Sequence, residues 1–170
     1  MLQFIGEIFT IFLACFIIGM LPAAKGRSPF PVLMVIAGCI SILPLVFGLI
    51  IGAAFFFWLP VLLFKILLFI MCFVIILLLF SLHHPSYGYL PYKKHIHLIV
   101  IGVFFFLLGM EFAAFGFSAW FLLLLVPLGV AAMIAGFLLM IKLFISFKYV
   151  AFIHFLPLIL FLLLAVLKLL

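Results

Sequence analysis

With His154 set aside, three ionisable side chains lie inside the long apolar stretches of this sequence: Glu7, Lys65 and Glu111. A charge at the centre of a bilayer costs at least ~2.5–3.5 kcal/mol, so such residues tend to have a partner or a function. The helical rise places all three at a similar depth, about 7–9 Å inside their helix ends. We therefore hypothesise that Lys65 pairs with one carboxylate and that the other holds a proton or a cation.

Each of these residues also has a simpler interpretation. Glu7 stands near the start of its helix, where the helix dipole favours a carboxylate and the side chain can reach the surface. Lys65 can extend its four-carbon stem towards the surface in the same way. Glu111 has a short side chain and follows a long uncharged run, so it is the strongest candidate for a pairing or binding role.

The segment from His83 to His97 holds four of the five histidines, together with Lys93 and Lys94. Its histidines lack the tight spacing of zinc sites, and no Cys, Asp or Glu accompanies them. We expect an interfacial loop whose two lysines face lipid headgroups, with no metal and no cofactor. We expect His154, a lone histidine in an apolar helix, to be hydrogen-bonded to a neighbouring helix.

Enzymatic chemistry has little support in this chain. It contains only two acidic residues, so a paired-carboxylate or magnesium site has few ligands available. None of the sequence patterns G-x-S-x-G, H-E-x-x-H, C-x-x-C or a phosphate-binding loop occurs. We do not expect an enzyme.

The composition decides the class of protein. The chain is 74% hydrophobic and 6% charged, whereas a soluble domain has about a quarter of its residues charged. Apolar runs without alternation predict an all-α, polytopic integral membrane protein. The net charge of +6 is spread in ones and twos at the ends of apolar runs, which does not indicate nucleic-acid binding.

The apolar runs predict a single domain, residues 1–170, with six transmembrane helices. About 20 apolar residues cross the hydrocarbon core, and turn-forming residues divide the two longest runs. The expected spans are residues 3–24, 31–57, 60–82, 97–117, 120–141 and 149–167. They form two sets of three helices around the central polar loop.

Basic residues concentrate in alternate loops and predict the orientation. Six of the eight lie in or beside the loops 25–29, 83–96 and 142–148. By the positive-inside rule these loops are cytosolic in a cell membrane, and both termini point outward. The opposite side has only Lys168, which we place just beyond the sixth span.

Small residues predict where helices pack, because close backbone approach replaces the hydrophobic drive that is missing in lipid. The second and fifth spans each carry a stripe of small residues and an interior proline, so we expect them to be central. The intervals between the two glutamates and between the two prolines differ, so we do not expect an internal repeat. The packing residues are Gly38, Ser41, Gly48, Gly52, Gly129, Ala132 and Gly136.

Two functions remain open from the sequence. The preferred hypothesis is a non-enzymatic membrane subunit or accessory protein, in contact with the lipid bilayer and with another membrane protein or with itself. The alternative is a small transporter or solute-binding component with an ionisable site at Glu111, Lys65 and Glu7. The near absence of polar residues favours the first, and the intramembrane charges favour the second.

Overall fold

The computed structural model describes residues 2–23, 30–55, 59–82, 96–117, 119–146 and 151–169. Within these ranges the protein is all-α, which confirms the predicted class and the six helices. The elements are α1 (Leu2–Ala23), α2 (Phe30–Phe55), α3 (Val61–Leu82), α4 (Ile96–Ala114), η1 (Ala119–Phe121), α5 (Leu122–Ser146), η2 (Ala151–Phe155) and α6 (Leu156–Leu169).

Five of these helices are long and apolar enough to cross a membrane, and the shorter apolar α6 follows them. The protein is therefore a multi-pass membrane protein by the length and composition of its helices. Several boundaries differ from the expected spans. Helix α4 ends at Ala114, ahead of Gly116, whose φ of 78° is the left-handed conformation that glycine adopts readily at a helix end. Helix α5 runs through Lys142 to Ser146, and α6 includes Lys168.

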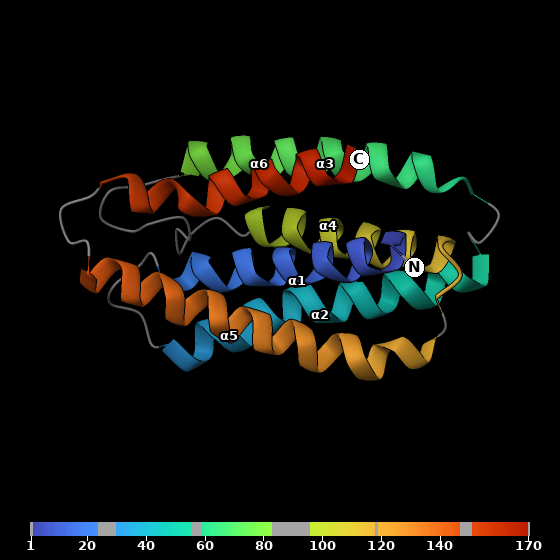
Figure 1. Cartoon of the computed structure of the whole chain (residues 1–170), viewed down its shortest axis with the longest axis horizontal. Coiled ribbons are helices and arrows are strands. Elements are labelled where there is room, and N and C mark those ends of the chain that lie inside the picture. Colours follow the sequence, from blue (N-terminus) through green and yellow to red (C-terminus); the bar gives the residue numbers. More distant parts are fainter. Residues whose placement is uncertain are drawn as a thin grey trace.

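Successive helices run in opposite directions along one bundle (Figure 1). Helices α1, α3 and α5 begin at the end that holds both chain termini, which we call the terminal end. They finish at the opposite end, where α2, α4 and α6 begin. We call it the basic end because, in the sequence, the segments between these helices contain five of the eight basic residues.

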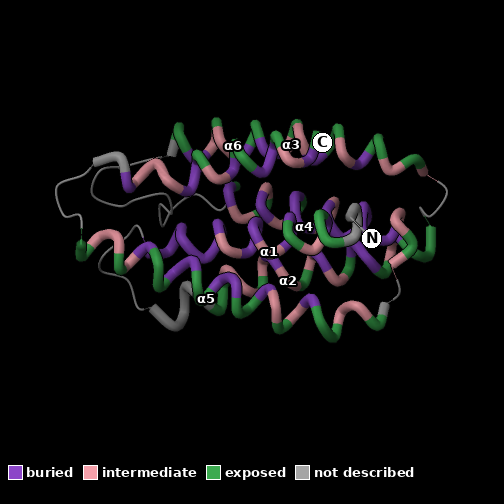
Figure 2. The backbone as a smooth tube through the Cα atoms, viewed as in Figure 1, coloured by how far each residue is buried: buried purple, intermediate pink, exposed green. Residues whose placement is uncertain are grey.

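The centre of the bundle is made by α1 and α4 (Figure 2). Most residues of these two helices are buried, whereas only a minority of the residues of α2, α3 and α5 are buried. Our expectation that the second and fifth helices are central is therefore wrong. Gly48 and Gly52 of α2 face the central helix α4, and Gly129 and Gly136 of α5 face the central helix α1. The same two helices also expose large apolar side chains, such as Phe47 and Leu138.

Glycines bring α5 directly against α1. A Cβ built on Gly19 would lie 2.1 Å from the carbonyl oxygen of Met133, and one on Gly136 would lie 2.1 Å from the carbonyl oxygen of Phe16. Gly19 thus lies against a carbonyl three residues before Gly136, and Gly136 lies against a carbonyl three residues before Gly19. This reciprocal contact is the close packing that small residues permit in membranes.

The same reciprocal contact joins α2 to α4. A Cβ on Gly48 would lie 2.0 Å from the carbonyl oxygen of Phe106, and one on Gly109 would lie 2.2 Å from that of Leu45. Gly52 extends the contact, because its Cβ would lie 2.7 Å from the Cβ of Ala113. The pair α2–α4 therefore repeats the geometry of the pair α5–α1.

The repeated contacts reveal an internal repeat in the sequence. Without any gap, the stretch F-I-I-G-M-L-P-A-A, which begins at Phe16, aligns with F-L-L-G-M-E-F-A-A, which begins at Phe106. The glycines Gly19 and Gly109 coincide in this alignment. Burial follows the same register, since nearly every buried position of α4 matches a buried position of α1.

The other two helix pairs follow the same relation. The buried residues of α2 (Ser41, Leu45, Gly48, Leu49, Gly52) match buried residues of α5 (Gly129, Met133, Gly136, Phe137, Met140). The buried residues of α3 (Phe64, Leu68, Cys72, Ile75, Leu79) match those of η2 and α6 (Ile153, Pro157, Phe161, Leu164, Lys168). The register changes by only one or two residues from one helix pair to the next.

The chain is therefore a repeat of three helices, and our expectation against a repeat is wrong. The interval from Glu7 to Glu111 differs from that from Pro44 to Pro127 because neither pair is equivalent in the repeat. Because each repeat has an odd number of helices, the second is inverted relative to the first, as the opposite directions of α1 and α4 show (Figure 1).

Gly48→Ala and Gly136→Ala should each destabilise the protein, because a methyl group would collide with a backbone carbonyl. Overpacking of this kind costs about 1–3 kcal/mol. The matched control is Gly38→Ala in the same helix as Gly48, where nothing lies within 4 Å of the added Cβ. Thermal unfolding in mild detergent measures the effect. If Gly48→Ala unfolds at the same temperature as Gly38→Ala, the contact does not hold the helices together.

Candidate functional site

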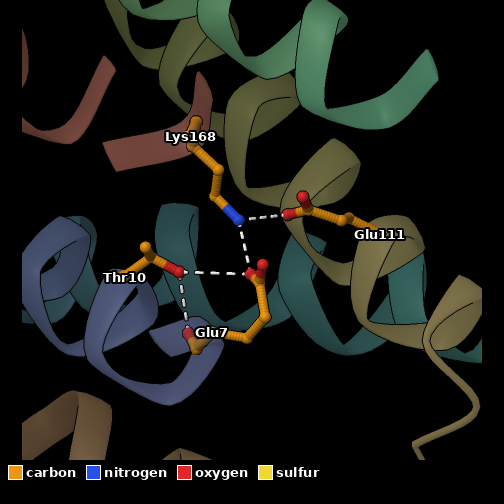
Figure 3. Close-up of polar contacts among 4 residues, drawn as sticks. All are labelled: Glu7, Thr10, Glu111 and Lys168. Atoms are coloured by element: carbon orange, nitrogen blue, oxygen red, sulfur yellow. Dashed lines mark hydrogen bonds and ion pairs between the residues drawn. The ribbon is translucent and has the colours of Figure 1, made fainter. Parts of the chain in front are cut away.

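Two carboxylates and one ammonium group meet near the terminal end of the bundle (Figure 3). Glu7 comes from the early turns of α1, Glu111 from the last turns of α4, and Lys168 from the last turn of α6. All three are buried: their residues are 7%, 0% and 1% exposed. We call this cluster the charge triad.

Lys168 joins the two acids. Its Nζ lies 2.5 Å from Oε2 of Glu7 and also makes an ion pair and hydrogen bond with Oε2 of Glu111. Helix α6 is positioned for this by its contact with α1 and by the ring contact of Phe161 with Phe104 of α4, whose centroids are 6.2 Å apart. The lysine therefore links the two central helices through the last helix.

Glu7 has a second polar neighbour. The hydroxyl of Thr10, one turn later on α1, lies 3.4 Å from Oε2 of Glu7 and donates to its backbone carbonyl at 2.7 Å. Thr10 is itself buried. The carboxylate of Glu7 thus has both a cation and a hydroxyl within reach.

Glu111 is less well satisfied than Glu7. Its Oε2 accepts from Lys168, but its Oε1 is buried and has no hydrogen-bond partner among the described residues. A buried polar atom without a partner is costly, and such atoms often mark a functional position. Glu7 repels this carboxylate, and Lys65 on α3 attracts it at longer range.

The base of the triad is Lys168, where the sequence led us to expect Lys65. Lys65 is half-buried and makes no ion pair within the part of the chain that the structure describes. The expected sixth span ends at residue 167, just before Lys168, whereas α6 continues to Leu169. Two signals could have identified it: the topology places it on the same side as both glutamates, and it is the only basic residue on that side outside the expected spans.

The expected packing residues fall into two groups. Gly48, Gly52 and Gly136 make the backbone contacts described above, and Gly129 lies against Sγ of Cys15. Ala132 and Ser41 are fully buried, and the Ser41 hydroxyl lies 3.6 Å from Sδ of Met133 on α5. Gly38 has nothing within 4 Å of a built Cβ, so it takes no part in close packing.

Histidines occupy other positions. His97 is buried in the first turn of α4, at the basic end. In the repeat it is the counterpart of Glu7. His154 lies in η2, with its ring centroid 4.9 Å from that of Phe144. No three His, Cys, Asp or Glu side chains gather around a metal position within the described ranges.

The headgroup-binding role expected of Lys93 and Lys94 falls outside the described residues, as do His83, His84 and His95. The buried polar and charged side chains of the described residues are those of the charge triad together with Thr10, Ser41 and His97.

In comparisons with known proteins, no family model matches this chain, and no curated protein or solved structure matches it either.

Lys168→Met should destabilise the protein strongly, because it leaves two carboxylates buried without their base. Removing one partner of a buried ion pair costs about 3–5 kcal/mol. Lys65→Met makes the same chemical change at a half-buried lysine without an ion pair in the described structure, so we expect little effect. Thermal unfolding of the purified variants compares the two. Equal losses of stability would show that Lys168 has no special part in the bundle.

Proposed function

We propose that this protein is a small secondary carrier that works by alternating access. The observation that supports the proposal most directly is the inverted repeat of three helices. Inverted repeats are the architecture in which many transporters place their sites, between two halves of opposite orientation. The proposal takes up the second of the two functions considered from the sequence.

The repeat provides a physical basis for two states. The glycine contacts between α1 and α5 have the same geometry as those between α4 and α2. An exchange of conformation between the two halves would therefore preserve equivalent packing, so that a state open at the terminal end and one open at the basic end can have similar energies. A small energy difference is what a ligand can bias.

The polar residues break this symmetry. The counterparts of Glu111 and Lys168 are Leu21 and Leu79, so the triad exists at one end only. At the basic end, the counterpart of Glu7 is the buried His97. The triad would close the terminal end by charge pairing, and apolar contacts around Leu21 would close the basic end.

The proposal includes a location and an orientation. The protein would lie in the cell membrane with its basic end cytosolic, as the positive-inside rule predicts. The terminal end, with the triad, would then face outward. No catalytic residue is part of the proposal.

Alternating access predicts labelling of buried positions from one side only. In a variant whose Cys15, Cys39 and Cys72 are replaced by Ala, Thr10→Cys should react slowly with an impermeant maleimide added outside intact cells. Leu21→Cys should react only from the cytosolic side in inverted vesicles. Both positions are buried in this structure, so reaction requires opening. Phe161→Cys, buried between the helices, serves as the control that reacts from neither side.

Adding Lys168→Met gives the sharper test. Loss of the base weakens closure at the terminal end, so labelling of Thr10→Cys should rise while labelling of Leu21→Cys falls. A variant that merely loosens the bundle would raise both. Parallel changes, or no labelling at either position, would contradict the carrier and favour a static accessory subunit.

A further inference from the structure

The charge count of the triad is uneven. It contains two carboxylates and one ammonium group, so that it carries one net negative charge when every group is ionised. The three residues are buried within apolar helices, where an uncompensated charge is expensive. Lys65 makes no ion pair with either acid in the described structure, and its longer-range attraction reaches Glu111 from α3.

The hydrogen bonds show which acid can carry a neutralising proton. Glu7 accepts on Oε2 from Nζ of Lys168. The Thr10 hydroxyl lies 3.4 Å from the same oxygen, but its one hydrogen is donated over the shorter 2.7 Å contact to the Glu7 backbone carbonyl. The ammonium donor stabilises an ionised carboxylate. Glu111 receives one donor, on Oε2, and its buried Oε1 has no described partner. A proton bound to Oε1 of Glu111 would therefore displace no existing hydrogen bond.

We infer that the charge triad binds one proton, held on Oε1 of Glu111. A hydronium ion transfers a proton to the Glu111 carboxylate. An O–H bond of the hydronium ion breaks, an O–H bond forms at Oε1, and a water molecule is released. The bound state is then a neutral acid at Glu111 beside an ion pair between Glu7 and Lys168, and the site carries no net charge. Opening of the terminal end would admit water and let the proton leave.

The role of this proton as a coupling ion rests on the proposed carrier function, because release of the proton requires the terminal end to open. Its binding does not depend on that function, since the charge count applies to any bundle of this structure. The other titratable groups facing Glu111 in the described residues are Glu7 on α1, Lys168 on α6 and Lys65 on α3. His97 lies at the far end of α4.

Infrared spectroscopy of the purified protein in lipid at neutral pH tests the inference. We expect one protonated-carboxyl C=O band, which shifts on exchange into deuterated water. The band should disappear in Glu111→Gln and also in Glu7→Gln, because either change leaves one acid paired with one base. It should remain in the matched control Lys65→Met and become stronger in Lys168→Met.

Two results would overturn the inference. Absence of the band in the wild-type protein would show that the site is not protonated. A band in the wild type that disappears when sodium chloride replaces choline chloride would show that sodium, not a proton, is the preferred cation. The cysteine-labelling experiment reads opening of the bundle independently, so failure of the carrier function and failure of proton binding give different results.

Discussion

The close approach of helix backbones at glycine is the constraint on which this structure depends. In a bilayer the apolar side chains gain little by leaving lipid, so helices associate where their backbones can touch. Here those contacts join helices of different halves: α5 of the second half packs on α1 of the first, and α2 of the first packs on α4 of the second. The halves are interlocked, and neither forms a separate bundle.

This interlocking also explains where the charges meet. Because the central helices run in opposite directions, an early position of α1 and a late position of α4 lie at the same end. Glu7 and Glu111 are thus brought together although they are not equivalent in the repeat. The site arises from the asymmetry between the halves, while the scaffold arises from their similarity.

Composition predicts the membrane class, and the lengths of the apolar runs with their turn-forming residues predict the six helices, because length and hydropathy determine what can span lipid. The triad was only partly predictable. The depths of Glu7 and Glu111 followed from the helix rise, but choosing their partner required the end of α6 to within one residue, which an apolar sequence specifies poorly. Lys65 and Lys168 each stand near a helix end, and only the packing of α6 against α1 distinguishes them.

The repeat is present in the sequence, but its rarest residues do not carry it. Comparing the rarest residues, the glutamates and prolines, gives them more weight than the small residues that determine packing. Gly19 and Gly109 mark the repeat because a Cβ at either position would collide with a backbone carbonyl. The buried apolar positions around them differ between the halves, because Leu, Ile and Phe can replace one another there. In membrane proteins of this composition, glycine register is the more informative signal.

The position of Lys168 in the last helix has a consequence for the order of assembly. In a bundle of α1 to α5 alone, Glu7 and Glu111 would lack the only ion-pair partner that the described residues give them. Docking of α6 supplies the missing charge and fastens both central helices in one step. The ion pairs that join α1 to α4 can therefore form only once α6 is in the bundle.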